Sequence, residues 1–269
     1  MIQESRFAGL FYPETRQLLE ETIQVFFKSI PQRKEKPVKG VIVPHAGYKY
    51  SGSVAAESLF NTKHLNIKTA IIIGPSHQFS FFGASTLVKK EYQTPIGNSL
   101  IDLEKVEFLL KKSQFLIDEP AAFNNEHSIE VILPFLFSLH PKTAIIPIVI
   151  GKYNNDVINE LVRLLASICK QEETLIITST DFSHFFSAKQ ASVKDQKAIN
   201  LIKEKNINKL ITEHQQQAIQ LCGFGPLLIM LYLLKVWNVN QVEHLNYAHS
   251  GEITGDPSSV VGYNSVIFY

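Results

Sequence analysis

Apolar residues in this chain gather in short uninterrupted runs, and stretches with helical spacing separate these runs. The runs from Val41 to Val43 and from Ala70 to Ile73 are rich in β-branched residues, which is typical of strands buried on both faces. The strands predicted from such runs are 40–44, 69–73, 144–151, 174–179, 242–248 and 260–268.

Between the strands, apolar residues three and four positions apart predict helices that bury one face, as Leu19, Ile23 and Phe26 do in the first of them. Pro134 predicts a kink or an early end in its helix. Turn and β-branched residues at 83–99 predict a hairpin or an excursion from the main sheet. The predicted helices are 13–29, 51–60, 103–112, 126–139, 155–170, 191–205, 207–217 and 224–237.

The alternation of buried strands and helices predicts an α/β fold with a mostly parallel central sheet and helices on both faces. The sequence has no internal repeat, low-complexity segment or clear linker, so we expect residues 1–269 to form a single domain. With 45% hydrophobic residues, a chain of this length can bury a full core.

Charge and motif content exclude several classes of protein. The 26 basic and 25 acidic residues nearly cancel, so no strong field favours nucleic acid or an anionic membrane. No apolar run approaches the roughly 20 residues that span a bilayer. No signal-peptide pattern and no glycine-rich phosphate loop is present, and the two cysteines do not form a disulfide framework. We therefore expect a cytoplasmic protein without a nucleotide cofactor.

Two histidines follow buried strands at a turn: His45 comes after 40–44, and His77 comes after 69–73 and a Gly-Pro-Ser segment. The carboxyl ends of parallel strands share one edge of the sheet, where ligands bind in open α/β folds. The pair therefore predicts half of a metal or catalytic site, with structural capping as the alternative.

Three further segments carry chemistry at the ends of predicted elements. Asp181 and His184 follow strand 174–179, either as a catalytic pair or as a helix cap and an exposed histidine. Glu126 and His127 open a helix and fit a role in holding the strand-end imidazoles. Cys222 precedes the apolar helix 224–237, either as a ligand or nucleophile or as an inert buried thiol.

Taken in order, eight short motifs resemble those of the Memo family, whose prokaryotic members are called AmmeMemoRadiSam system protein B. The resemblance extends nearly from end to end of the chain. The motifs are AGLFYP at 8–13, PHAGYKYSG at 44–52, GPSH at 74–77, TPIG at 94–97, EHSIEVILP at 126–134, STDFSH at 179–184, CG at 222–223 and SSVVGY at 258–263.

This resemblance implies a fold similar to that of the class III extradiol (LigB-type) dioxygenases, which use a non-haem iron. It also implies that His45, His77 and Cys222 bind a metal, with iron or copper as candidates, and that Asp181 and His184 line the same pocket. The extradiol enzymes pair two histidines with a carboxylate. A thiolate in that place favours Cu(I) or zinc more than a carboxylate does and argues against ring cleavage.

Three hypotheses follow. In the first, the protein is a metal-dependent oxidoreductase of unknown substrate, in which Asp181 or His184 moves protons. In the second, a non-catalytic pocket binds a small molecule, a peptide or a partner from the radical-SAM system that the family name implies. In the third, Cys222 is the nucleophile of a metal-free enzyme.

Overall fold

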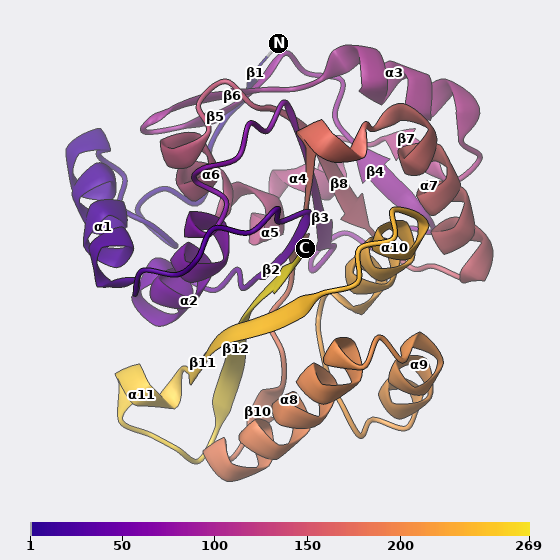
Figure 1. Ribbon diagram of the computed structural model, residues 1–269. Helices are drawn as coiled ribbons and strands as arrows, with labels where there is room; N and C mark the ends of the chain where they lie inside the picture. The colour runs from indigo at the N-terminus through magenta and orange to yellow at the C-terminus, as the bar shows by residue number, and fades with distance from the viewer. Residues whose placement is uncertain (1) are drawn as a thin grey trace.

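The computed structural model describes residues 2–269, and its centre is a sheet of nine strands (Figure 1). Four neighbouring strands in the middle of this sheet run parallel to one another. In spatial order they are β2 (Gly40–Val43), β9 (Thr174–Ser179), β3 (Thr69–Pro75) and β8 (Ala144–Ile150). Nearly all of their residues are buried, as their continuous apolar sequence predicts.

The strands on both sides of this parallel core make the sheet mixed. β12 (Val260–Phe268) is antiparallel to β2, and it also pairs with β10 (His184–Phe186) and β11 (Val242–His249). On the other side, β4 (Ala84–Thr86) is antiparallel to β8 and parallel to β7 (Leu116–Asp118). The predicted α/β fold is confirmed; its sheet is mixed, and the four central strands form the longest parallel part.

Helices cover both faces of the sheet (Figure 1). On one face, α10 (Phe224–Val236) packs against β9 and β3. α7 (Asn155–Ile168) covers α10, and α3 (Leu103–Lys112) packs against α7. The opposite face carries α2 (Tyr48–Phe60), α1 (Arg16–Ser29) and α6 (Leu133–Leu139). None of the helices in residues 2–269 is both long enough and apolar enough to cross a membrane.

The remaining elements are shorter or lie at the periphery. α8 (Ala188–Lys203) packs against β10, β11 and β12, and α9 (Ile207–Gln215) packs against α8. A small second sheet contains β1 (Ile2–Gln3), β5 (Glu91–Thr94) and β6 (Gly97–Leu100). The short helices are α4 (Ala121–Asn124), α5 (His127–Glu130), α11 (Gly251–Thr254) and a 3-10 turn at Gln171–Glu173.

Two predicted segments differ in detail from the structure. The helix predicted at 126–139 is divided into α5 and α6, and Pro134 occupies the first turn of α6, where a missing N–H costs nothing. The hairpin predicted within 83–99 is formed by β5 and β6, whereas β4 joins the main sheet. α5 packs against β3, and the Ser128 hydroxyl donates to the carbonyl of Pro75 at the end of that strand at 3.0 Å.

Candidate metal centre

His45 follows β2, and its imidazole is held in one orientation. Its Nδ1 lies 2.7 Å from Ser179 Oγ, and that hydroxyl donates its only hydrogen to the carbonyl of Ser128 at 2.5 Å. Ser179 can therefore only accept a hydrogen bond from Nδ1–H. Because Nδ1 carries the proton, the lone pair of the neutral ring is on Nε2. The backbone N–H of His45 donates to Asp181 Oδ1 at 2.9 Å.

His77 follows β3 and is held by the carboxylate of Glu126. Its backbone N–H donates to Glu126 Oε2 at 2.5 Å, and its Nδ1 lies 2.9 Å from Oε1. An ionised carboxylate only accepts hydrogen bonds, so Nδ1 carries a proton and Nε2 is the atom available to a metal. Gly74 allows this arrangement, because a Cβ there would lie only 2.4 Å from Ser128 Oγ.

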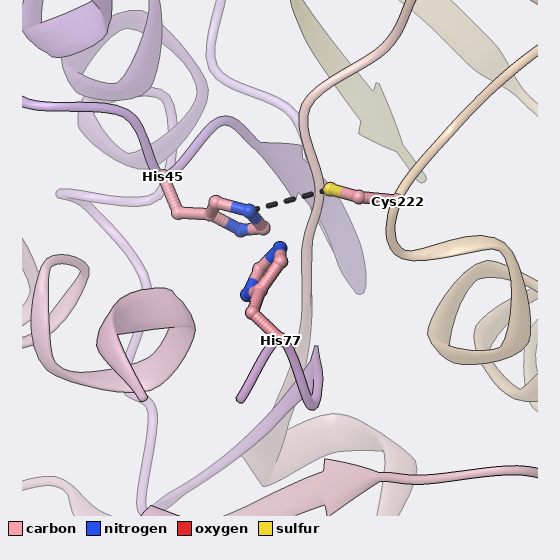
Figure 2. A group of neighbouring side chains, drawn as sticks. All are labelled: His45, His77 and Cys222. Carbon is pink, nitrogen blue, oxygen red and sulfur yellow. Dashed lines mark hydrogen bonds between the residues drawn. The ribbon is translucent and has the colours of Figure 1, made fainter. Parts of the chain in front are cut away.

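Cys222 reaches the two histidines from the turn before α10. Its Sγ lies 3.3 Å from His45 Nε2 and accepts the backbone N–H of Asp181 at 3.2 Å. The next residue, Gly223, lets the turn approach β9, since a Cβ there would lie 2.6 Å from the carbonyl oxygen of Ser179. One ligand atom of each of His45, His77 and Cys222 lies within 4.8 Å of the others (Figure 2).

Burial and neighbouring charges keep the ligand atoms of His45 and Cys222 uncharged. Burial, with the nearby His77 charge, lowers the pKa of His45 to about 3. Burial also raises the pKa of the Cys222 thiol well above its usual range, and the Asp181 carboxylate raises it further. A cation at the centre would stabilise the thiolate that these surroundings disfavour.

Glu126 and His77 shift the pKa values of each other. Burial alone would raise the pKa of Glu126, but its hydrogen bond and charge interaction with His77 outweigh this and lower the pKa to about 2. Burial likewise opposes a charged His77, whose pKa is nevertheless raised by Glu126. Glu126 is therefore ionised, as the carboxylate partner of a ligating histidine must be.

His127 lies against the centre. Its ring stacks on His77 with centroids 4.7 Å apart, and its centroid is 5.1 Å from that of His45. Burial, with the nearby His45, lowers the pKa of His127 to about 4, which keeps it neutral. Together with His77 and Glu126 it forms a second group whose ligand atoms lie within 4.8 Å of one another.

Asp181 and His184, both predicted to line the pocket, have different surroundings. Asp181 is buried and connects His45 with Cys222: its carboxylate accepts the N–H of His45, and its carbonyl accepts the N–H of Cys222 at 3.2 Å. His184 opens β10, and its backbone N–H donates to Gln220 Oε1 at 3.0 Å. Its charge lowers the pKa of His45, so it lies near the centre, but no hydrogen bond in the described part of the chain joins the two rings.

The sequence reasoning missed two contributors to the site. Ser179 is the last residue of β9, and its hydroxyl sets the tautomer of His45. Its polar side chain at the end of an apolar run was a usable signal. Phe11, in the N-terminal segment, lies 4.6 Å from the His127 ring, and nothing in the local sequence indicated this contact.

The sequence profile described as "Memo-like protein" matches residues 3–267 of this chain. A MEMO1 family protein from Methanobrevibacter smithii is 37% identical, and the alignment covers both chains completely. A MEMO1 family protein from Methanocaldococcus jannaschii is 36% identical, and the alignment covers 97% of this chain and 96% of that protein. Another from Thermoplasma volcanium is 31% identical, with 99% of this chain and 98% of that protein covered.

Among solved structures, an uncharacterized protein from Escherichia coli K12 has a similar arrangement, with a TM-score of 0.48 and 13% sequence identity. The alignment covers 86% of this chain and 99% of that protein. A likeness of this size adds nothing to the reasoning about the site.

Proposed function

The chain belongs to the Memo-like protein family, and from that premise we propose that it is a metal-binding redox protein whose centre consists of His45, His77 and Cys222. The observation that carries the proposal is the orientation of the two imidazoles. Ser179 and Glu126 engage the two Nδ1 atoms, so both rings offer Nε2 to the side where Cys222 lies.

This donor set fits a transition metal. Two imidazole nitrogens and one thiolate suit iron, copper and zinc, whereas magnesium and calcium prefer oxygen. Bound iron or copper would supply one-electron chemistry, which zinc lacks. The thiolate shifts the preference toward copper or zinc relative to the two-histidine, one-carboxylate set of ring-cleaving oxygenases.

The chain's own residues supply positioning and proton handling around that centre. Asp181 holds the backbone of His45 and, through its own carbonyl, the backbone of Cys222. Burial raises the pKa of the Asp181 carboxyl, which makes it a better proton acceptor than an exposed aspartate. His184, three residues after Asp181, is the second candidate for moving a proton in this proposal. In this proposal the substrate is a small molecule or a peptide that binds in the pocket.

A metal-free cysteine enzyme is the second candidate, and the 3.3 Å contact between Cys222 Sγ and His45 Nε2 favours it. The same structure argues against a reactive thiolate, because burial and Asp181 raise the pKa of Cys222 and burial lowers that of His45. We therefore rank this function below the metal-binding one. Either role for the thiol suits a reducing compartment such as the cytoplasm.

Titration of the metal-free protein with Co²⁺ under anaerobic, reducing conditions tests the proposal. We expect one equivalent to bind and to produce a thiolate-to-cobalt charge-transfer absorption. His45→Ala and His77→Ala should each abolish tight binding. His64→Ala is the control: it changes an exposed histidine between α2 and β3 and should bind Co²⁺ as the wild type does. Wild-type protein without this absorption, or His45→Ala and His77→Ala variants that retain it, would contradict the proposal.

A further inference from the structure

Glu130 is a buried carboxylate at the end of α5 that contacts the N-terminal segment of the chain. It accepts hydrogen bonds from the backbone N–H groups of Arg6 at 3.0 Å and Phe7 at 2.7 Å and from the Tyr12 hydroxyl at 2.6 Å. Arg6 thus offers its backbone to the carboxylate, not its guanidinium. We call residues 6–12 the N-terminal loop, which Glu130 anchors at both ends.

The anchored loop carries two aromatic rings against His127. The centroid of Phe11 lies 4.6 Å from that of His127, and the centroid of Phe7 lies 5.7 Å from it. The two phenylalanine rings also meet edge to face at 5.2 Å. The loop closes on itself through a hydrogen bond from the N–H of Phe11 to the carbonyl of Phe7 at 2.8 Å. Movement of the anchor would therefore move both rings.

His127 transmits this packing to the candidate centre, because its ring stacks on His77 with an interplanar angle of 21°. Glu126 is the N-cap of the same short helix, and its carboxylate holds His77 at Nδ1. One helix thus supplies two buried carboxylates with different tasks. Glu126 orients the ligand, and Glu130 holds the loop that packs against the neighbouring ring.

We propose that Glu130 is a positioning residue of the candidate metal centre, which acts through the N-terminal loop and His127 on the orientation of His77. The inference rests on the proposed function for its effect on metal affinity. Its effect on the ring of His127 is independent of any metal. Burying a carboxylate costs free energy, which a loop that only packs on the surface does not require. A loop that keeps the region around His77 rigid has a use for such a fixed contact.

The test is a double-mutant cycle between Glu130→Gln and Phe11→Ala in the full chain. Glutamine keeps one oxygen for Phe7 and Tyr12, but it removes the negative charge and places an N–H₂ group beside the N–H of Arg6, so the anchor is weakened with little change in volume. We expect each single variant to weaken Co²⁺ binding about tenfold. The double variant should also lose about tenfold, because both changes act along one path; a loss of about 100-fold would overturn the proposal.

A second measurement uses the metal-free protein and separates this inference from the proposed function. The NMR signals of the His127 ring should shift in both variants, because Phe11→Ala removes the ring current of Phe11 and Glu130→Gln moves the Phe11 ring relative to His127. Unchanged His127 signals in Glu130→Gln would overturn the role of Glu130 even if the wild type binds Co²⁺. If the wild type binds no Co²⁺, the proposed function fails, and the NMR result still decides whether Glu130 orients His127.

Two further variants guard against a trivial outcome. Tyr12→Phe removes a single hydrogen bond to Glu130 and should produce the same changes at a smaller size, about two- to threefold in affinity, even if Glu130→Gln does not fold. Glu4→Gln changes the charge of an exposed glutamate near the same loop and should leave both readouts as in the wild type. Equal effects of Glu4→Gln and Glu130→Gln would contradict the proposal.

Discussion

The two edges of the central parallel strands differ in the chemistry and the exposure of their side chains. At the amino edge, α3 and the starts of β3 and β9 line a groove of about 760 Å³. It contains an exposed ion pair between Lys68 and Glu173 at 2.6 Å, and Lys105 donates to Thr69 Oγ1 at 3.1 Å. At the carboxyl edge, His45, His77 and Cys222 converge within 4.8 Å of one another.

The chemistry of the side chains at each edge distinguishes the candidate site from the groove. In the groove, Lys68 and Glu173 neutralise each other in contact with solvent, where ion pairs contribute little. The carboxyl edge instead orients two imidazole lone pairs and a thiol toward one point and surrounds them with buried carboxylates. Chemistry at the carboxyl edge also agrees with the general position of ligand sites in open α/β sheets.

Loss of the thiol should produce the largest difference between the edges. We expect Cys222→Ser to weaken Co²⁺ binding more than about 100-fold, because a ligand contributes more than the residues that only orient it. Cys169→Ser is the matched control: this buried cysteine ends α7 near the amino edge and should leave Co²⁺ affinity unchanged. Calorimetric titration measures both, and similar losses in the two variants would remove the distinction between the edges.

The pH dependence of stability should reveal the buried carboxylates behind the carboxyl edge. Burial raises the pKa of Asp195, which accepts the N–H of Ser183, to about 6. Between about pH 4 and pH 6 the folded chain therefore retains a proton that the unfolded chain has lost, so this group makes the free energy of unfolding fall as pH rises. Asp195→Asn should remove this fall, which amounts to roughly 2–3 kcal/mol.

Urea denaturation at several pH values measures this effect. The difference in unfolding free energy between Asp195→Asn and the wild type should grow in favour of the variant from pH 4 to pH 6 and stay constant above. Glu107→Gln, at an exposed position of the amino-edge groove, is the control and should show no such trend. Parallel curves for wild type and Asp195→Asn would show that the carboxyl edge carries no such buried charge.

The orienting carboxylate should have an intermediate effect. Glu126→Gln replaces an acceptor of three N–H groups by an amide that presents an N–H₂ group to one of them. We expect Co²⁺ affinity to fall about 10- to 100-fold while the fold is retained. The comparison is Glu173→Gln at the amino edge, which should bind Co²⁺ as the wild type does. Wild-type affinity in Glu126→Gln would mean that His77 needs no orienting partner.

The smallest effect is expected at the exposed amino-edge pair. Lys68→Met breaks the contact with Glu173, and both side chains are well exposed to solvent. We expect the urea midpoint and the Co²⁺ affinity to stay within experimental error, because screened surface pairs contribute little. A clear loss of metal binding in this variant would show that the two edges are coupled, contrary to the picture of separate roles.

Much of the fold was predictable because burial leaves a local signature. The uninterrupted apolar runs of β2, β3, β8 and β9 predicted the parallel core, and the turn residues after β2 and β3 predicted where His45 and His77 emerge. The direction of β12 was not predictable in the same way. A strand buried on both faces has the same apolar sequence whether its neighbour is parallel or antiparallel.

The site was predictable only as far as residue type and element ends allow. Glu126 and Glu130 look equivalent in the sequence, as two carboxylates one helical turn apart. Their different partners, His77 and the N-terminal loop, depend on segments 49 and more than 100 residues away. Ser179 likewise acquires its role only from the distant carbonyl of Ser128. Such contacts arise from tertiary packing, which a local pattern does not encode.

The central claim is that the carboxyl edge holds a metal between His45, His77 and Cys222. Elemental analysis of protein purified without oxygen tests it most directly. The account predicts close to one transition-metal ion per chain in the wild type and in Cys169→Ser, and almost none in His45→Ala and Cys222→Ser. A metal-free wild type, or equal metal content in all four proteins, would contradict the claim.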